Sequence, residues 1–256
     1  MAKIISVISG KGGVGKTTTV SNLGAALVSK GKEVIVIDGN VTTPNLSLHL
    51  GIPFYPLTLH DVLKKKIPIT SAIYEHPSGL KIIPASLSVD AMKGVSMEKM
   101  ENALWSLLGS ADIILVDSAA GLGREAMSSM NLADELIVVT NPDLPAVTDA
   151  LKTIKMAEQN GTKVMGVVVN RFSGKKHEMK INEIRSMLNS PILSVVPEDS
   201  AIPKSIHHKK PVVHHRPNSE ASKAFFRLAS MVAGEPVIER LEKERGWFDM
   251  LTSWFR

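Results

Sequence analysis

The chain has 256 residues, of which 44% are hydrophobic and 21% are charged, and this balance excludes a wholly disordered protein. It contains no cysteine, so disulfides and thiolate-ligated metal sites are excluded, and a cytoplasmic location fits that absence. The net charge of +5 is a mild basic excess that favours anionic partners only weakly. The N-terminal run lacks the features of a signal peptide, and no stretch of about 18 apolar residues could span a bilayer.

Short β-branched segments alternate with stretches of helical spacing along the chain. The predicted strands are residues 3–9, 33–38, 80–84, 112–117, 135–140, 163–170 and 192–196. The predicted helices are residues 16–30, 97–108, 143–160 and 178–189, and the pattern is helical again after Pro217. Most of the strands are apolar throughout, as expected for strands covered on both faces. We therefore predict a doubly wound α/β fold, with a mostly parallel sheet flanked by helices and ligands at the carboxyl ends of the strands.

Residues 10–17 read Gly-Lys-Gly-Gly-Val-Gly-Lys-Thr and satisfy the G-x-x-x-x-G-K-[ST] pattern between a predicted strand and a predicted helix. Glycines let backbone N–H groups surround a phosphate, and the following helix directs its positive end at the anion. Lys16 would reach the β- and γ-phosphates, and Thr17 would offer its hydroxyl to Mg²⁺. We predict a site for ATP or ADP with Mg²⁺, and a chance glycine turn is the alternative. Its expected nucleotide-binding residues are Gly10, Lys11, Gly12, Gly13, Val14, Gly15, Lys16, Thr17 and Thr18.

Lys11 is a second lysine that a generic phosphate loop does not need. The resulting K-G-G-x-G-K-T pattern resembles the signature of the MinD/ParA group of deviant-Walker ATPases, to which nitrogenase iron protein also belongs. In that family the extra lysine reaches the nucleotide of the partner subunit. The resemblance, which covers residues 1–235, therefore implies an ATP-dependent homodimer in which Lys11 stabilises developing charge. The alternative is a solvated loop cation.

Other segments extend the resemblance. Residues 113–121 are similar to the family's Walker B strand and switch II, which implies that Asp117 holds the water shell of Mg²⁺. Residues 34–38, followed by Asn45-Leu46 and Leu50-Gly51, resemble its second strand and switch I. The residues implied to lie near the adenine are Asn170, Arg171, Pro197, Glu198 and Asp199. The segment 209–213 matches the family's G-K-P-V-V turn only in part, because its first residue is lysine.

Switch I departs from the family pattern, which usually reads D-x-D. This chain has Asp38-Gly39-Asn40, and an amide cannot carry the negative charge or accept a proton as a carboxylate does. We therefore hypothesise slow ATP hydrolysis and a long-lived ATP dimer; alternatively, another residue positions the water. The implied catalytic residues are Lys11, Lys16, Asp38 and Asn40, and the implied metal site comprises Thr17, Asp38 and Asp117.

The C-terminal segment has an amphipathic pattern. At helical spacing its large apolar residues share one face, and they are Trp247, Phe248, Met250, Leu251, Trp254 and Phe255. A helix over residues 247–256 would be about 15 Å long, too short to span a bilayer, and tryptophan favours the membrane interface. We predict an ATPase domain over residues 1–235 and a membrane-targeting helix within 236–256, similar to that of MinD proteins. A helix that binds a partner protein and one that docks on the chain's own core are the alternatives.

Residues 206–216 combine two histidine pairs with lysine and arginine. The carboxylate or thiolate co-ligands of a strong metal site are missing, so this segment is interpreted as a basic, titratable patch rather than a metal site. Clustered lysine and arginine also suffice for non-specific DNA binding, although no DNA-reading module is visible.

Three functions are compatible with these features. The first is a MinD-like ATPase switch for spatial positioning, in cell division or a related process. It would dimerise with ATP and attach peripherally and reversibly to a membrane, with an unidentified activating or cargo protein. The second is a ParA-like partitioning ATPase on DNA, and the third is an ATP-dependent scaffold that hydrolyses very slowly. The aromatic C-terminal segment favours the first, because DNA binding does not require an apolar face.

Overall fold

The computed structural model describes residues 2–51, 54–64, 66–93, 95 and 99–236. The predicted membrane-targeting residues 247–256 and the start of the predicted helix 97–108 lie outside these ranges. Within the described residues, no helix combines the length and the apolar content needed to cross a bilayer.

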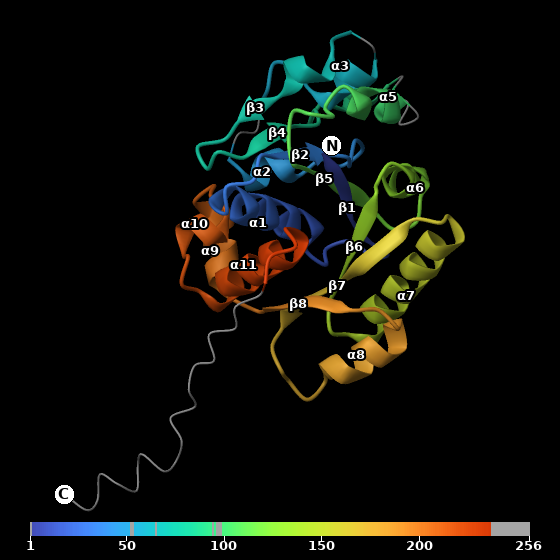
Figure 1. Ribbon diagram of the computed structural model, residues 1–256, viewed down its shortest axis with the longest axis vertical. Coiled ribbons are helices and arrows are strands. Elements are labelled where there is room, and N and C mark those ends of the chain that lie inside the picture. Colours follow the sequence, from blue (N-terminus) through green and yellow to red (C-terminus); the bar gives the residue numbers. More distant parts are fainter. Residues whose placement is uncertain (1, 52–53, 65, 94, 96–98, 237–256) are drawn as a thin grey trace, which may run out of the picture.

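A single eight-stranded sheet in the order β3-β4-β2-β5-β1-β6-β7-β8 forms the centre of the molecule (Figure 1). All its strand pairs are parallel except β3 with β4, which confirms the predicted doubly wound, mostly parallel fold. The strands are β1 Lys3–Ser9, β2 Val34–Asp38, β3 Tyr74–Glu75, β4 Lys81–Ile83, β5 Ile113–Ala120, β6 Glu135–Thr140, β7 Lys163–Phe172 and β8 Ile192–Pro197. The antiparallel β3 was not predicted, because a strand of two residues is too short to show an alternating pattern.

Helices connect the strands and cover the sheet. Their bounds are α1 Lys16–Ser29, α2 Leu46–His49, α3 Leu59–Leu63, the 3₁₀ helix η1 Ile69–Ala72, α4 Val89–Met92, α5 Met100–Trp105, α6 Arg124–Asn131, α7 Leu144–Gln159, α8 Ile181–Leu188, α9 Ala201–His207, α10 Val212–His215 and α11 Glu220–Val232. The predictions for α1, α7 and α8 are confirmed, with shifts at their ends. The predicted helix 97–108 is shorter, since α5 ends at Trp105 and turns follow. Helix α6 was missed because it is short and mostly polar.

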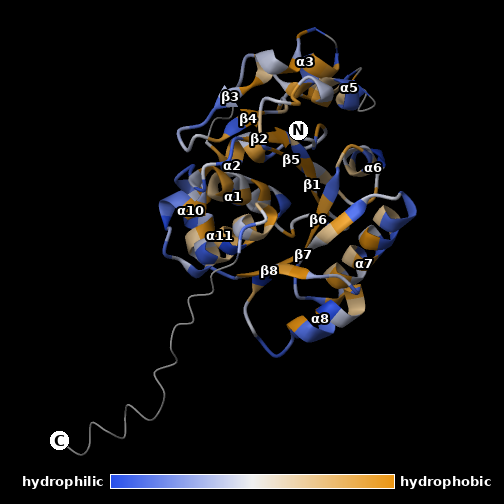
Figure 2. Ribbon diagram, viewed as in Figure 1, coloured by the Kyte–Doolittle hydropathy of each residue, from blue (hydrophilic) through white to orange (hydrophobic). Residues whose placement is uncertain are grey.

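Apolar side chains from both faces of the sheet enter separate cores. In Figure 2 the central strands are mostly orange, whereas the helices mix orange and blue. In β2, Val34 and Val36 pack into the core formed with α1 and α11. The alternate residues Ile35 and Ile37 pack into the core formed with α3 and α5. A third core joins β6 and β7 to α7 and α8. The continuous apolar strands of the sequence therefore result from burial on both faces.

Parallel pairing brings the carboxyl ends of the central strands to one edge of the sheet. Asp38 at the end of β2 pairs in register with Asp117 of β5, and Ser9 at the end of β1 pairs with Ala120. The loop that follows β1 therefore lies beside the last residues of β2 and β5. This edge is where a doubly wound fold places its ligands.

Candidate functional site

The loop between β1 and α1, residues 10–15, has a backbone that requires glycine at its closest contacts. Gly15 has φ 101°, in the left-handed region, and a Cβ there would lie 2.1 Å from Asn170 Nδ2. A Cβ on Gly10 would lie 2.4 Å from the carbonyl oxygen of Asp149 in α7. Larger residues would therefore displace the loop from β7 and α7. The glycines hold the loop at the N-terminus of the 14-residue helix α1, where backbone N–H groups are free to bind an anion.

Lys16 brings a buried positive charge to this loop. Its side chain is 8% exposed, and its Nζ donates to Ser9 Oγ over 3.0 Å. Ser9 Oγ in turn donates to the carbonyl oxygen of Lys11 over 2.7 Å. Burial lowers the pKa of the Lys16 ammonium, and the nearby carboxylate of Asp117 partly opposes this effect. A phosphate group at the loop would supply the counter-charge that this desolvated ammonium needs.

Asp38 and Asp117 are adjacent carboxylates, both almost fully buried. Burial raises the pKa of Asp117 to about 6, while the Thr17 hydroxyl, which donates to it, and Lys16 act in the opposite direction. Burial and then the charge of Asp117 raise the pKa of Asp38 well above its ordinary value. Asp117 Oδ1 has no hydrogen-bond partner among the described residues. Two desolvated carboxylates beside a threonine hydroxyl fit the water shell of a bound Mg²⁺.

Backbone groups of the loop after β2 bind the Asp38 carboxylate. This loop, residues 39–45, corresponds to the predicted switch I. Asp38 Oδ2 accepts from the N–H groups of Asn45 and Leu46 over 3.1 and 3.0 Å, and Oδ1 accepts from that of Asn40 over 3.3 Å. These bonds fix the start of α2 against the end of β2. Any movement of switch I must therefore change the environment of Asp38.

The Asn40 side chain closes a turn within switch I. Its Oδ1 accepts from the backbone N–H and the hydroxyl of Thr43, each over 3.1 Å, and its Nδ2 donates to the Thr43 carbonyl over 2.7 Å. An aspartate could accept the first two bonds but could not make the third. Asn40 therefore has a structural partner in this conformation, and its predicted role in positioning water stays a prediction.

Two residues that hold switch I were missed from the sequence. The Thr42 hydroxyl donates to the carboxylate of Glu125, in the first turn of α6, so the loops after β2 and β5 are joined. The ring of His60 contacts the carbonyl oxygen of Val41 through Nε2 over 3.0 Å, and its Nδ1 accepts from the Ser86 N–H over 3.0 Å. With Nδ1 as an acceptor, Nε2 carries the proton, so His60 is neutral. An acidic residue at the start of a helix and a lone histidine carry no motif that could have identified them.

The residues predicted to lie near the adenine meet at a small cavity of about 170 Å³. It is lined by Thr18, Asn170, Arg171, Glu198, Asp199, Ile202, Pro203 and Ile206. Asn170 Nδ2 donates to the carbonyl oxygen of Val14 over 2.7 Å, while its buried Oδ1 has no partner among the described residues. Pro197 does not line the cavity and pairs with Phe172 at the end of β7 and β8. The apolar residues of α9 were missed, because their role appears only when α9 lies beside β7.

Lys11 differs from Lys16 in its exposure. Half of its side-chain surface is accessible, and its Nζ lies 4.0 Å from Asp143 Oδ1, a distance at which an exposed ion pair contributes little. Asp143 is itself the N-cap of α7 and accepts from the Ala146 N–H over 2.9 Å. The Lys11 ammonium is therefore exposed and only weakly held by Asp143.

Comparisons with known proteins agree with this geometry. The ParA family model described as "NUBPL iron-transfer P-loop NTPase" matches residues 1–233. The uncharacterized ATP-binding protein MJ0547 of Methanocaldococcus jannaschii is 38% identical over 248 residues, which cover 97% of this chain and 94% of that protein. The septum site-determining protein MinD of Thermotoga maritima is 34% identical over 269 residues, with 100% and 98% covered. The structure of MinD complexed with Mg-ADP from Pyrococcus horikoshii OT3 superposes with a TM-score of 0.87 and 36% identity, over 91% of this chain and 96% of that one.

Proposed function

Because the chain belongs to the ParA family of P-loop NTPases and is a MinD-like ATPase of that family, we propose that it is an ATP-dependent membrane switch. In this proposal, ATP with Mg²⁺ drives dimerisation, the dimer attaches reversibly to a membrane, and hydrolysis to ADP and phosphate releases it. The switch would position a cargo protein in cell division or a related process. The observation that carries the proposal is the convergence of Lys16, Thr17, Asp38 and Asp117 at one edge of the sheet.

Each group at this edge has a chemical task that suits its surroundings. Lys16 would bind the β- and γ-phosphates, because its ammonium is desolvated and its Nζ donates to the neutral hydroxyl of Ser9. Thr17 and the two aspartates would hold Mg²⁺, which when bound neutralises charge on the phosphates. Asn170 Oδ1, a buried acceptor without a partner in the described structure, would accept from the amino group of the adenine. Arg171, Glu198 and Asp199 would surround the base.

Dimerisation would depend on Lys11. A half-exposed ammonium whose ion pair in the described structure is a distant one can bind the nucleotide of a second subunit at little cost. In that position it would stabilise the negative charge that develops during phosphoryl transfer. ATP would then be part of the dimer interface, and its hydrolysis would weaken the dimer.

Turnover would be slow because Asn40 stands where the family usually has a carboxylate. Its amide is also engaged with Thr43, so it must leave that turn to orient a water molecule. Both features favour a long-lived ATP state. An activating protein would then have to act on switch I, where the Asn40 turn and the Thr42 contact with Glu125 hold the loop.

Membrane attachment would use the apolar residues of 247–256, which lie outside the described residues. Each copy would enter the interface only shallowly, so a single copy would bind weakly. An ATP dimer presents two copies, and their combined affinity can exceed that of one by orders of magnitude. This avidity is a physical route by which nucleotide state would control attachment.

The first test measures ATP turnover by the full chain and its sedimentation with lipid vesicles in the presence of ATP or ADP. We expect slow turnover and sedimentation with ATP only. Lys11→Ala and Trp254→Glu should each abolish ATP-dependent sedimentation, and Lys11→Ala should leave nucleotide binding. If the unaltered chain sediments in neither state, membrane attachment is wrong, and retention on DNA would support the ParA-like alternative.

The role of Asn40 is tested by Asn40→Asp. We expect this variant to hydrolyse ATP faster, by about tenfold or more, because a carboxylate can position and activate the water. Thr43→Ala, which removes one partner of Asn40 and adds no carboxylate, is the matched control. An Asn40→Asp variant with unchanged turnover would assign the slow rate to another cause.

A further inference from the structure

Residues 200–219, here called the basic segment, contain most of the chain's excess positive charge. They include Lys204, Lys209, Lys210 and Arg216 with four histidines, and no aspartate or glutamate, in a chain whose net charge is +5. None of these four cations takes part in the ion pairs found among the described residues. The segment forms α9, α10 and the turn before α11. The cavity beside Asn170 and Arg171, here called the nucleotide cavity, lies on the other side of α9.

A cavity of about 410 Å³ lies between α9 and the turn that precedes α11. Its lining comprises Ser200, Ala201, Lys204, His215, Arg216, Pro217, Asn218 and Ser219. An ammonium, a guanidinium and an imidazole thus surround one hollow, together with hydroxyl and amide groups. These are the donors that bind the oxygens of a phosphate group, and the planar guanidinium can bind two of them at once.

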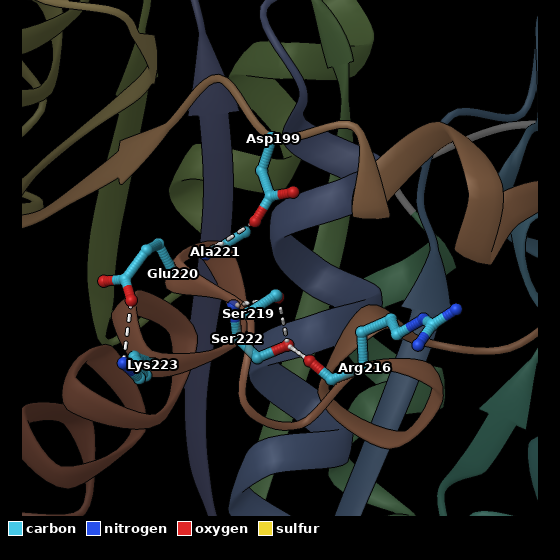
Figure 3. Close-up of polar contacts among 7 residues, drawn as sticks. All are labelled: Asp199, Arg216, Ser219, Glu220, Ala221, Ser222 and Lys223. Atoms are coloured by element: carbon cyan, nitrogen blue, oxygen red, sulfur yellow. Dashed lines mark hydrogen bonds and ion pairs between the residues drawn. The ribbon is translucent and has the colours of Figure 1, made fainter.

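The carboxylates that flank the basic segment are engaged elsewhere (Figure 3). Asp199 accepts from the N–H groups of Ala201 and Ala221 over 2.8 and 3.2 Å, and so joins the starts of α9 and α11. Glu220 pairs with Lys223 over 2.7 Å, on the side away from the Arg216 guanidinium. In the described structure neither acid next to the segment in sequence forms an ion pair with Lys204 or Arg216.

The backbone around Arg216 is fixed, although its guanidinium takes part in no ion pair of the described structure. The Ser222 hydroxyl donates to the carbonyl oxygens of Arg216 and Val212 over 2.7 and 3.0 Å. The Ser219 N–H donates to the Arg216 carbonyl over 2.9 Å. The turn thus carries Arg216 at a defined place beside the cavity. A site held by its backbone needs less ordering when a ligand binds.

Neighbouring groups add to the positive potential. The rings of His208 and His215 stack with their centroids 4.7 Å apart. Burial lowers the pKa of His215, and the nearby His208, Arg216 and Lys210 lower it further. These groups disfavour another positive charge, so they would equally favour an anion.

The basic segment lies in the same layer of the molecule as the end of the described chain. Helices α9, α10 and α11 share one core with α1 on the same face of the sheet, and the described chain ends just after α11 in that layer (Figure 1). Residues 239–256 contain four acidic and four basic side chains, so they have no net charge of their own. The positive charge that could select an anionic surface is therefore in the basic segment, on the layer from which the C-terminal segment departs.

We propose that the cavity lined by Lys204, His215 and Arg216 binds the phosphate headgroup of an anionic phospholipid. This inference rests on the proposed membrane attachment and deepens it. The apolar residues 247–256 would provide insertion into any bilayer, and the basic segment would provide the preference for anionic lipid. A basic residue near an anionic membrane strengthens binding by roughly fivefold.

The test compares the full chain with ATP on two kinds of vesicle, phosphatidylcholine alone and equal parts of phosphatidylcholine and phosphatidylglycerol. We expect the unaltered chain to bind the mixed vesicles more tightly. Lys204→Gln with Arg216→Gln should lose roughly 25-fold on mixed vesicles and almost nothing on neutral ones. Its affinity for ATP should not change, since neither residue lines the nucleotide cavity. The matched control is Lys175→Gln with Lys176→Gln, the same charge change at exposed positions after β7.

Each other outcome has a defined meaning. Equal losses in the two double variants would show that only net charge matters and would overturn the assignment. If inorganic phosphate raises the melting temperature of the unaltered chain but not of the cavity variant, while vesicle affinities match, the cavity binds free phosphate instead. Loss of DNA affinity with unchanged vesicle affinity would identify a nucleic-acid site. An unaltered chain that binds both vesicles equally overturns this inference alone, whereas one that binds neither overturns the proposed function with it.

Discussion

The phosphate loop and the basic segment both present positive groups to an anion, yet they are built in opposite ways. At the phosphate loop one ammonium, Lys16, is almost completely buried and is accompanied by backbone N–H groups. In the basic segment, lysine, arginine and histidine side chains lie largely at the surface around an open cavity. Burying a charge costs free energy unless partner groups surround it in a favourable geometry. An exposed charge costs little at any position on the surface. The first arrangement therefore needs a strict local pattern, and the second needs only an excess of cations.

The segment after switch I, beside the phosphate loop, contacts the basic segment through Gly51 and Lys209. Gly51 lies just after α2, the helix that follows switch I. Its φ is 81°, and a Cβ there would lie 2.2 Å from Lys209 Cβ. Lys209 also has a left-handed backbone, with φ 57°. A change in switch I could thus reach the basic segment through one tightly packed contact.

The largest expected effect separates the buried site from the exposed one. Lys16→Ala should reduce ATP turnover by about 10²–10³-fold, because it removes a buried cation from the phosphate loop. Lys93→Ala, at an exposed position in an ion pair with Asp90, should change turnover less than twofold. Steady-state phosphate release measures both. Comparable losses of turnover in the two variants would mean that the burial of Lys16 does not make its charge more important for turnover than that of Lys93.

Asp117→Asn should stabilise the nucleotide-free protein at pH 7 while it abolishes Mg²⁺-dependent turnover. The pKa of Asp117 is about 6 against an ordinary value of 3.8, so ionisation in the folded state costs up to about 3 kcal/mol. This cost is absent below pH 3.8 and is complete above about pH 6. Urea unfolding at pH 7 and at pH 5 should show that the variant gains free energy of unfolding over the parent, and that this gain is smaller at pH 5. Asp90→Asn, at an exposed carboxylate, should show no gain at either pH.

Gly51→Ala tests the contact between the segment after switch I and the basic segment. The left-handed backbone and the close approach of Lys209 should together destabilise the variant by about 2 kcal/mol. Gly109→Ala has a similar backbone, with φ 97°, but no atom within 4 Å of the added Cβ among the described residues, so it measures the backbone strain alone. Thermal unfolding compares them. Equal losses of stability in the two variants would show that Lys209 moves aside easily. The contact would then transmit little of any change in switch I to the basic segment.

The smallest expected effect concerns the pH dependence of switch I. Burial lowers the pKa of His60 below its ordinary value of 6.5, so the folded state binds fewer protons than the unfolded state below that pH. The stability contributed by neutral His60 is therefore complete above pH 6.5 and is lost as the pH falls. His60→Gln keeps a donor for the Val41 carbonyl and should show a flatter pH dependence between pH 7 and 5.5. His177→Gln, at an exposed position, should unfold like the parent at every pH, and an identical slope for all three would contradict the role of His60.

The parts of the site that could be predicted from the sequence are those made by neighbouring residues. The strand, loop and helix around Lys16 form within one short segment, so their pattern identified them. Asp38 and Asp117 were predictable because each follows an apolar run of the sequence, and parallel pairing brings the two positions into register. Glu125 and His60 were not predictable, since each acts on switch I from a separate helix. The same holds for Ile202 and Ile206, which line the cavity beside Asn170 and Arg171 only because α9 packs near β7.

The sequence by itself determined the strand pattern, the doubly wound sheet and the phosphate loop, because hydrophobic period and glycine conformation act over a few residues. It also showed that positive charge is concentrated before α11. Only the tertiary structure decided that Asn40 is engaged with Thr43, and that Lys204 and Arg216 share a cavity while Asp199 is occupied by helix N–H groups. Such contacts join residues through packing of separate elements, and packing depends on the shape of the whole core rather than on any local pattern.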